Sequence, residues 1–348
     1  MKNWVYDAIR KISADYKRSA DTHLIKLDVP SLSGIDLYLK DESTHPTGSL
    51  KHRLARSLFL YALCNGKISN KTTIVEASSG STAVSEAFFA RMIGIPFIAV
   101  MPKSTARSKI KQIELYGGRC HFVDSATQMR EESLALVSSI DGYFMDQFTY
   151  AERATDWRGN NNIAESIFNQ LEQEPHPVPH SIIMSAGTGG TSATIGRYIH
   201  YKGYDTQLVV VDPENSVFYD SFMTHDRGIT LKVGSRIEGI GRPQVEPSFQ
   251  PDVIDSMKQV PDAASIAAIL WLESIIGRKA GASTGTNLWG ALEVAINMKA
   301  EKQRGSIVTL MCDSGERYLD TYYDPEWVKL NIGDVAPYLD QLNDIHTA

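Results

Sequence analysis

Short apolar strands alternate with helical segments along most of this chain, and no other feature limits its fold as strongly. Residues 72–77 form an apolar run that predicts a strand, the loop 78–82 follows, and residues 83–94 have the spacing of a helix. The same order recurs over residues 96–123 and again over residues 180–215. Such a repeat is typical of a mostly parallel sheet covered by helices, so we predict an α/β fold.

Chain length sets the expected number of domains. The 348 residues, of which 43% are hydrophobic, suffice for about two domains of ~150 residues, each with its own core. We predict two α/β domains, one over residues 41–155 and a larger one made of residues 1–40 together with residues 156–348. Ligands of such folds bind at the carboxyl ends of the strands, so we expect a site in a cleft between the domains.

Charge and hydropathy exclude several classes of protein. The net charge is −6 and the basic residues are scattered, so we expect no nucleic-acid partner and no membrane-binding patch. No apolar run approaches the ~18 residues of a spanning helix, and residues 1–20 lack the apolar centre of a signal peptide. Cys64, Cys120 and Cys312 lie too far apart for a zinc or redox pair. These features predict a reduced, cytoplasmic protein without a bound metal.

A glycine-rich loop, Gly187-Thr188-Gly189-Gly190-Thr191, follows an apolar strand and opens a helix. Glycines let the backbone approach a ligand closely, and the amides and dipole of a helix N-terminus hold an anion. No lysine follows the last glycine, and Ser192 stands where a dinucleotide-binding loop has its third glycine. The loop predicts a phosphate site that is neither common nucleotide motif, although an ordinary glycine turn has the same pattern.

Two further loops carry hydroxyl groups. Ser78-Ser79-Gly80-Ser81-Thr82 suits a carboxylate at a helix start, although Ser and Thr are also favoured there as simple N-caps. Residues 281–285 match the Gly-x-Ser-x-Gly elbow of α/β hydrolases, and Ser283, Asp313 and His346 would complete a triad. The preceding residues read as a helix rather than the required strand, and His346 lies two residues from the end. A serine hydrolase is therefore the remote alternative.

The stretch "THPTGSLKHR", residues 44–53, places a constrained turn directly before Lys51 at the start of an apolar helix. A positioned lysine, a phosphate loop, a carboxylate-sized loop and a separate serine loop together match the needs of pyridoxal phosphate. The lysine supplies the imine, and the phosphate and the substrate carboxylate each need their own donors. Taken together, these four features predict a pyridoxal phosphate enzyme.

These motifs resemble those of the fold-type II pyridoxal phosphate enzymes, the cysteine synthase and cystathionine β-synthase family. "PTGSLKHR" resembles the family's P-T-G-S-F-K-D-R, "SSGST" its T-S-G-N-T loop, "GTGGT" its phosphate loop and "GASTG" its G-I-S-S-G loop. "EGIGRP" (residues 238–243) and "DSGERY" (residues 313–318) match further segments. The resemblance runs in the family's order over nearly the whole chain. It implies a two-domain tryptophan synthase β-like fold and a homodimer.

The resemblance also implies a role for each matching residue. Lys51 would form the Schiff base and then move the substrate's Cα proton. The residues that would hold the cofactor are Lys51, Ser81, Gly187, Thr188, Gly189, Gly190, Thr191 and Ser283. Those that would hold the substrate carboxylate are Ser78, Ser79, Gly80, Thr82 and Gln147. Ser283 would face the pyridine nitrogen, and a neutral serine there makes the ring a weaker electron sink, which favours β-elimination.

The sequence departs from the family pattern at several positions. Ser81 replaces the asparagine beside the cofactor's 3-hydroxyl, so that contact would be longer or mediated by water. His52 replaces the aspartate after the lysine, and His45 replaces an asparagine. Adjacent side chains on a helix diverge by about 100°. A structural role for His52 is therefore favoured over one as a proton donor.

Several stretches, among them residues 18–30 and 152–168, look like the bacterial L-cysteine desulfhydrase branch of the family. This resemblance implies degradation of L-cysteine to hydrogen sulfide, pyruvate and ammonia. Synthesis of cysteine from O-acetylserine shares its central intermediate and is the alternative. A non-catalytic relative would usually lack the lysine that is present here. Residues 152–162 are read as structural rather than substrate-binding, and the tail from Pro325 packs either on its own domain or on a partner.

Overall fold

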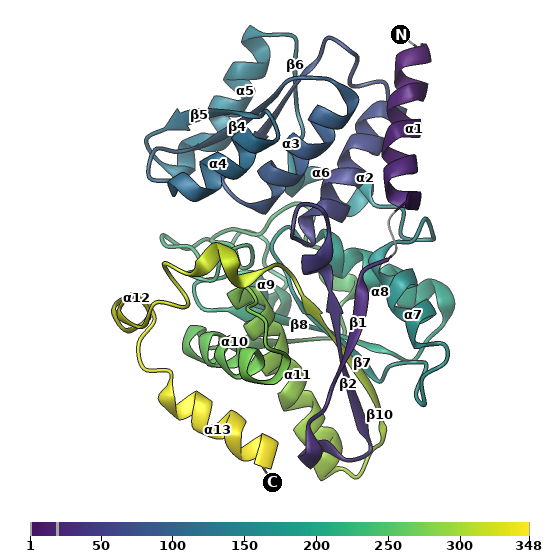
Figure 1. The fold of residues 1–348 in the computed structure, drawn as a ribbon, viewed down its shortest axis with the longest axis vertical. Coiled ribbons are helices and arrows are strands. Elements are labelled where there is room, and N and C mark those ends of the chain that lie inside the picture. Colours follow the sequence, from purple (N-terminus) through teal and green to yellow (C-terminus); the bar gives the residue numbers. More distant parts are fainter. Residues whose placement is uncertain (1, 19–20, 348) are drawn as a thin grey trace. The chain divides into compact units, whose positions relative to one another are not determined.

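The computed structural model describes residues 2–18 and 21–347, and predictions that fall on residues 1, 19, 20 and 348 lie outside the described residues. The chain forms two compact units. Unit 1 comprises the described residues up to Asp21 together with His45–Thr155. Unit 2 comprises Thr22–Thr44 together with the described residues from Asp156 onward. Each unit combines a sheet with helices (Figure 1), which confirms the predicted α/β fold.

Unit 1 contains a four-stranded sheet in which every pair of neighbouring strands is parallel. Its strands, in spatial order, are β5 (Arg119–Val123), β4 (Phe97–Pro102), β3 (Thr73–Ala77) and β6 (Gly142–Phe144). Its helices are α1 (Lys2–Arg18), α2 (Lys51–Cys64), α3 (Ser81–Ile93), α4 (Arg107–Leu115), α5 (Met129–Ser139) and α6 (Gln147–Ala154), with the short 3-10 helix η3 (Ala126–Gln128). The strand, loop and helix order predicted for this region is therefore confirmed.

The two faces of this sheet bury different side chains, because successive residues of a strand point to opposite faces. Ile74 belongs to the main core, which also contains Phe59 of α2 and Phe89 of α3. Val75 points the other way, into a smaller cluster with Val100 that α5 covers. By the same alternation Glu76 shares the face of Ile74. A charged residue is thus directed into the main core of unit 1.

Helix α1 belongs to unit 1, whereas the sequence placed residues 1–40 with the larger domain. Ala8 and Ile12 are fully buried in the main core of unit 1, and α1 packs on α2 and α3 (Figure 1). The apolar stripe of an amphipathic helix has to be buried against some core. The sequence shows the apolar stripe of α1, but it does not show which of the two units has the core against which the stripe packs. Residues 41–44 were likewise predicted in the smaller domain and belong to unit 2.

Unit 2 contains a six-stranded sheet in which the β1–β2 pair is antiparallel and the other neighbours are parallel. Its strands, in spatial order, are β1 (His23–Leu27), β2 (Ile35–Asp41), β10 (Gly305–Met311), β7 (Ser181–Ser185), β8 (Gln207–Pro213) and β9 (Ser256–Val260). Its α-helices are α7 (Ile163–Leu171), α8 (Gly190–Lys202), α9 (Phe218–Thr224), α10 (Asp262–Ile276), α11 (Ala282–Ala300), α12 (Pro325–Asn331) and α13 (Ala336–Thr347). Short 3-10 helices occupy Pro30–Leu32, Glu42–Thr44, Pro251–Val253 and Gly315–Tyr318.

The chain after residue 324 packs on unit 2 itself. The Trp327 ring meets Tyr322 edge-on, with ring centroids 5.6 Å apart, and the Tyr338 ring meets Trp289 at 5.4 Å. Both residues lie against the core of this unit. Of the two predicted roles for the tail, packing on its own domain is therefore the observed one. No helix among residues 2–18 and 21–347 is both long and apolar enough to cross a bilayer.

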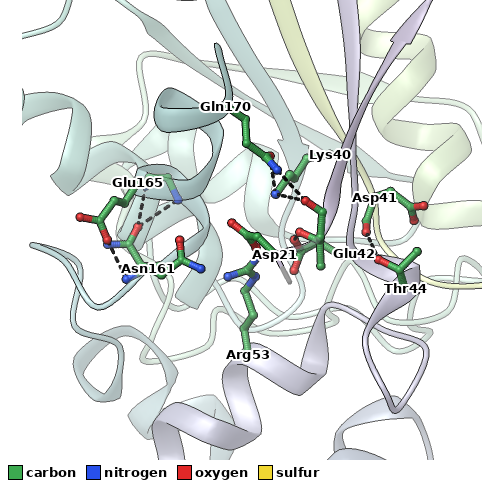
Figure 2. A network of polar contacts seen from close by, with 12 residues as sticks. Asp21, Lys40, Asp41, Glu42, Thr44, Arg53, Asn161, Glu165 and Gln170 are labelled. Carbon is green, nitrogen blue, oxygen red and sulfur yellow. Dashed lines mark hydrogen bonds and ion pairs between the residues drawn. The ribbon is translucent and has the colours of Figure 1, made fainter. Parts of the chain in front are cut away.

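A buried polar network fastens the first strands of unit 2 to α7 (Figure 2). The Lys40 ammonium, which is fully buried, donates to the Thr22 carbonyl at 2.8 Å and to Gln170 Oε1 at 2.6 Å. Gln170 Nε2 donates to the same carbonyl at 2.8 Å, and the Thr22 hydroxyl donates to Glu42 Oε1 at 2.7 Å. A buried charge is tolerated only when it is hydrogen-bonded in this way.

Candidate active site

The predicted site residues divide between the two units. Lys51, the loop 78–82 and Gln147 belong to unit 1, and the loop 187–191 and Ser283 belong to unit 2. In both units they stand where a strand or turn passes into a helix, at the helix N-terminus. The first turn of a helix has backbone N–H groups without intrahelical acceptors, so each of these positions is suited to an anion or a polar ligand.

Lys51 is the first residue of α2, and hydrogen bonds fix the turn before it. Gly48 has a φ of 70°, in the left-handed region that favours glycine, and its N–H donates to the His45 carbonyl at 2.7 Å. The Lys51 N–H donates to the Ser49 hydroxyl at 3.1 Å. The constrained turn predicted from the sequence is thus present, and it defines where α2 and its first side chain begin.

His52 has the contacts of a structural residue. Its side chain is buried, its Nδ1 lies 3.1 Å from Thr47 Oγ1, and that hydroxyl lies 2.9 Å from Ser85 Oγ of α3. The imidazole also packs against the rings of Phe88 and Phe89. These contacts tie the turn before Lys51 to α3.

Two residues of the predicted carboxylate site come together in unit 1. Thr82 Oγ1 donates to Gln147 Oε1 at 2.8 Å, although 65 positions separate the two residues, and both side chains are buried. Gln147 Nε2 has no acceptor in the described part of the chain, so its N–H groups remain available to a ligand. Ser78 Oγ accepts the N–H of Gly80 at 3.3 Å, while Ser79 and Ser81 are half-buried at the same helix start.

Glu76, which the sequence analysis did not single out, supports this pair. Its Oε1 accepts the N–H of Ala77 at 2.7 Å, and its Oε2 accepts the N–H of Gln147 at 3.1 Å. The carboxyl of Glu86 on α3 faces that of Glu76, and both side chains are fully buried. Burial raises the pKa of both carboxyls, and the charge of Glu76 raises the pKa of Glu86 further. The two backbone N–H groups that Glu76 accepts act against the rise of its own pKa, so Glu86 is the more readily protonated of the two.

The glycines of the loop 187–191 stand where larger residues do not fit. Gly189 has a φ of 89°, and a Cβ there would lie 2.5 Å from the Cα of Phe249. A Cβ at Gly187 would overlap the carbonyl oxygen of Gly239. The segment 238–243 therefore lies directly against this loop, at the N-terminus of α8. The crowding explains why the loop needs glycine, and it supports a cradle rather than an ordinary turn.

Ser283 lies in the first turn of α11, where it is 5% exposed. Within the described residues its hydroxyl has no protein hydrogen-bond partner. The loop before it is fastened to the end of β10, because the Gly281 N–H donates to the Asp313 carbonyl at 3.2 Å and the Cys312 N–H donates to Thr284 Oγ1 at 3.1 Å. A buried hydroxyl that the protein leaves without a partner, on a rigid support, suits a ligand atom.

Tyrosines of the segment after β10 complete this support. The Tyr318 hydroxyl donates to Asp313 Oδ2 at 2.7 Å, and burial together with the Asp313 charge raises the pKa of Tyr318. The Tyr323 hydroxyl donates to the Ala280 carbonyl at 2.8 Å and accepts the Ala280 N–H at 2.9 Å. Neutral phenols therefore hold the loop that carries Ser283.

The hydrolase alternative fails on this geometry. Helix α10, rather than a strand, precedes Gly281, so the loop 281–285 is not a nucleophile elbow. The His346 imidazole packs edge-on against Trp271, and no hydrogen bond joins it to Asp313 in the described structure. The sequence-based doubts about this triad were correct.

The donors present fit pyridoxal phosphate. The N-terminus of α8 and its glycines can hold the phosphate, the partnerless Ser283 hydroxyl can meet the ring nitrogen, and Lys51 supplies an amine for the imine. All of these groups belong to residues that the structure describes.

Comparisons with known proteins agree with this interpretation. The profile described as pyridoxal-phosphate dependent enzyme matches residues 18–313. L-cysteine desulfhydrase Cds1 of Mycobacterium tuberculosis is 59% identical over 331 residues, which cover 94% of this chain and 90% of that protein. Cysteine synthase B of Campylobacter jejuni is 30% identical, over 83% of this chain and 91% of that protein.

A crystal structure of a hydrogen sulfide-producing enzyme with an α-aminoacrylate intermediate has the same fold. Its TM-score is 0.77 at 24% identity, with 90% of this chain and 91% of that chain covered. The predicted fold-type II resemblance is therefore confirmed, as is the predicted cofactor. The chain belongs to the pyridoxal-phosphate dependent enzyme family.

Proposed function

We propose that this enzyme converts L-cysteine and water into hydrogen sulfide, pyruvate and ammonia. The observation that carries the proposal is the 59% identity, across 94% of the chain, to a protein named L-cysteine desulfhydrase. The first-turn positions of Lys51, Thr82 and Ser283 supply the groups that such a reaction needs. The name of that relative and the chemistry of these groups lead to the same reaction.

The proposed roles follow the geometry of each unit. In unit 2, residues 187–191 hold the cofactor phosphate and Ser283 donates to the ring nitrogen. In unit 1, Gln147 Nε2 donates to the substrate carboxylate and Thr82 orients that amide. Ser78, Ser79 and Gly80 add the donors of the helix start, and Ser81 lies beside the cofactor's 3-hydroxyl.

Lys51 is the proposed base. Pyridoxal phosphate, when bound, withdraws electrons from the amino acid's Cα and so makes its proton more acidic. Lys51 Nζ takes up the Cα proton, and the electron pair of the Cα–H bond forms the Cα–Cβ double bond. The Cβ–S bond breaks at the same time, and hydrosulfide leaves with the electron pair of that bond. Water then replaces the amino group, which leaves as ammonia. The fixed turn of residues 45–49 holds Lys51 in place through this proton transfer.

The test is an assay of sulfide and pyruvate from L-cysteine, with the absorbance of the bound cofactor recorded in the same sample. We expect both products in equal amounts from the wild-type enzyme. Lys51→Ala should lower kcat by about a thousandfold or more, because general base catalysis and the imine are both lost. Lys67→Ala, a change at an exposed lysine, is the matched control and should leave kcat unchanged.

Cysteine synthesis is the second candidate, because a protein named cysteine synthase B is 30% identical over most of its length. The same sample, supplied with O-acetylserine and sulfide, measures it directly. Release of cysteine there, with no sulfide from L-cysteine, would replace the proposed reaction by synthesis. A cofactor band that is absent even after addition of pyridoxal phosphate would contradict both.

We propose further that the enzyme is a cytoplasmic homodimer, as the family resemblance implies. Among the described residues Cys64, Cys120 and Cys312 form no disulfide bond, which supports a reducing compartment. Light scattering on the purified protein and fractionation of cells that produce it test the two statements. A mass of one chain, 38.5 kDa, would contradict the dimer.

A further inference from the structure

The buried carboxyl pair of unit 1 has no role in the mechanism above, yet it contacts the proposed carboxylate site. Glu76 stands at the end of β3, one residue from the loop 78–82, and Glu86 stands on α3, which begins in that loop. Both have no exposed surface. Burying a carboxyl is costly unless it is hydrogen-bonded, so an isolated pair of this kind calls for a specific contact.

Glu76 makes such contacts with both halves of the carboxylate site. One oxygen accepts the N–H of Ala77, at the entry to the loop 78–82, and the other accepts the N–H of Gln147, the first residue of α6. The first N–H groups of a helix lack intrahelical acceptors, so the carboxylate replaces one that the helix cannot provide. It thereby fixes the backbone on which the Gln147 amide is mounted.

Protonation of Glu86 would allow Glu76 to keep accepting these two N–H groups. Neither of its oxygens has a hydrogen-bond partner in the described residues, and after burial the charge of Glu76 raises its pKa the most. Two buried carboxylates at such a position cannot both be charged, so one proton is shared between them. With the proton on Glu86, Glu76 remains an acceptor for both backbone N–H groups.

We propose that Glu76 is a positioning residue that holds the Gln147 amide for the substrate's α-carboxylate. The contacts run from Glu76 to the Gln147 backbone, and from the Gln147 carbonyl to the Thr82 hydroxyl. This leaves Nε2 of Gln147 directed to the ligand. The inference rests on the proposed function in its placement of the carboxylate at Thr82 and Gln147.

The first experiment uses ligands rather than turnover. L-alanine has an α-carboxylate and no leaving group, and alaninol lacks the carboxylate. Both are titrated into the cofactor-loaded enzyme, with the absorbance of the bound cofactor as the readout. In Glu76→Gln, which cannot accept both N–H groups, we expect the apparent Kd of L-alanine to rise about tenfold or more. The Kd of alaninol should stay within about twofold.

Glu86 provides the matched variants. Glu86→Gln keeps a donor toward Glu76, so its affinity for L-alanine should stay near that of the wild type. Glu86→Leu removes the donor and should weaken L-alanine binding about three- to tenfold. Wild-type affinity in Glu86→Leu would overturn the inference, and this variant serves as the test if Glu76→Gln does not fold.

A double-mutant cycle decides whether Glu76 acts through Gln147. If it does, Glu76→Gln combined with Gln147→Ala should bind L-alanine no more weakly than Gln147→Ala alone. Additive losses, or equal losses for L-alanine and alaninol, would overturn the inference and leave Glu76 a general structural residue. Asp212→Asn, at a buried carboxyl of unit 2, controls for the loss of any buried carboxyl.

The failure of the proposed function would be visible separately. If the wild-type enzyme releases no sulfide from L-cysteine, the choice of reaction is wrong, while the L-alanine titration still reports on Glu76. If sulfide is released but Glu76→Gln binds L-alanine with wild-type affinity, the proposed reaction is supported and the positioning role of Glu76 is contradicted.

Discussion

Gly189 and Gly203 flank the same helix, α8, with φ values of 89° and 67°, but only Gly189 is crowded. A Cβ at Gly203 meets nothing within 4 Å. Gly189→Ala should therefore weaken pyridoxal phosphate binding about tenfold or more, because the added methyl pushes the cradle away from Phe249. Gly203→Ala should cost about 1 kcal/mol of stability and leave cofactor affinity unchanged. Absorbance titration of cofactor-free protein measures both, and equal affinities would contradict the cradle.

His52 provides a second test at the scale of the residue. His52→Ala should lower the free energy of unfolding by about 1–3 kcal/mol, since the Thr47 hydroxyl loses a buried partner and the Phe89 ring loses a neighbour. His52→Asn, which can still hydrogen-bond Thr47, should lose less. Denaturant unfolding measures the difference.

A catalytic His52 would instead show in the kinetics. The pH dependence of kcat in His52→Asn should match that of the wild type, because the imidazole transfers no proton in the proposed reaction. A shifted or lost pH limb would make His52 a proton donor.

The local structure around a single residue was predictable from the sequence where a turn or a glycine pattern marks it. Lys51 and Gly189 carried such marks. Glu76 and Glu86 did not, because a sequence shows a carboxylate in an apolar segment but not the partner across the core. Their unusual settings, at the end of an apolar strand and inside an apolar helix, were the available signal.

At the scale of the element, one buried face of α3 contains three polar side chains next to an apolar one. Thr82, Ser85, Glu86 and Phe89 follow the spacing of one helix face, and all four are buried. Three of them hydrogen-bond or face a partner on another element: Gln147, Thr47 and Glu76. The helix thus connects the proposed carboxylate site with the turn before Lys51.

The start of α7 explains the preceding loop. Asn162 Oδ1 accepts the N–H groups of Ala164 and Glu165, while its Nδ2 donates to carbonyls of residues 156, 157 and 159. Beside it, the Asn161 N–H donates to Glu165 Oε2 at 2.6 Å (Figure 2). These contacts favour the structural interpretation of the asparagines in residues 152–162.

Asn162→Ala should therefore lower the free energy of unfolding by about 1–2 kcal/mol, the usual effect of losing an N-cap. Asn169→Ala, at an exposed position of the same helix, is the matched control and should change stability by less than about 0.5 kcal/mol. Thermal unfolding compares the two. A large rise in KM for L-cysteine with unchanged stability in Asn162→Ala would make the loop a substrate contact.

Elements with strong local patterns were predictable, and those defined by distant partners were not. The strand at Thr73–Ala77 and the helix that starts at Lys51 appear where the sequence placed them, and Gly66, with a φ of 65°, follows the end of that helix. The antiparallel pairing of β1 with β2 is set by long-range contacts that periodicity does not contain.

At the scale of the whole molecule, a buried carboxyl should shape the pH dependence of stability. Burial raises the pKa of Asp212 to about 7 from an ordinary value of 3.8. The folded state thus binds more protons than the unfolded state between these values, so stability falls as pH rises from about 4 to 7. The loss from this group is up to about 4 kcal/mol, at 1.36 kcal/mol per pKa unit. Urea unfolding at several pH values measures it.

Asp212→Asn tests that assignment. The variant should show a flatter fall in stability over the same pH range, because the amide does not titrate. An unchanged slope would assign the pH dependence to other groups.

The fold class and the cofactor followed from the order of motifs along the chain. The assignment of residues to the two units was harder to predict. Helix α1 is amphipathic, and its sequence does not show that Ala8 and Ile12 are buried in the core of unit 1. The stretch of unit 1 that starts at His45 ends at Thr155.

Because β10 lies between β2 and β7, the sheet of unit 2 cannot be completed until β10 has been synthesised. β2 leaves the ribosome early, but its neighbour in the sheet, β10, begins at Gly305. Roughly 260 residues separate the two strands, which at about 5–20 residues per second is a delay of about 13 to 50 seconds. During that time β2 lacks the strand that pairs with its second edge, whereas the last strand of unit 1 is complete once residue 144 has been made. Unit 1 can therefore fold while unit 2 still lacks β10.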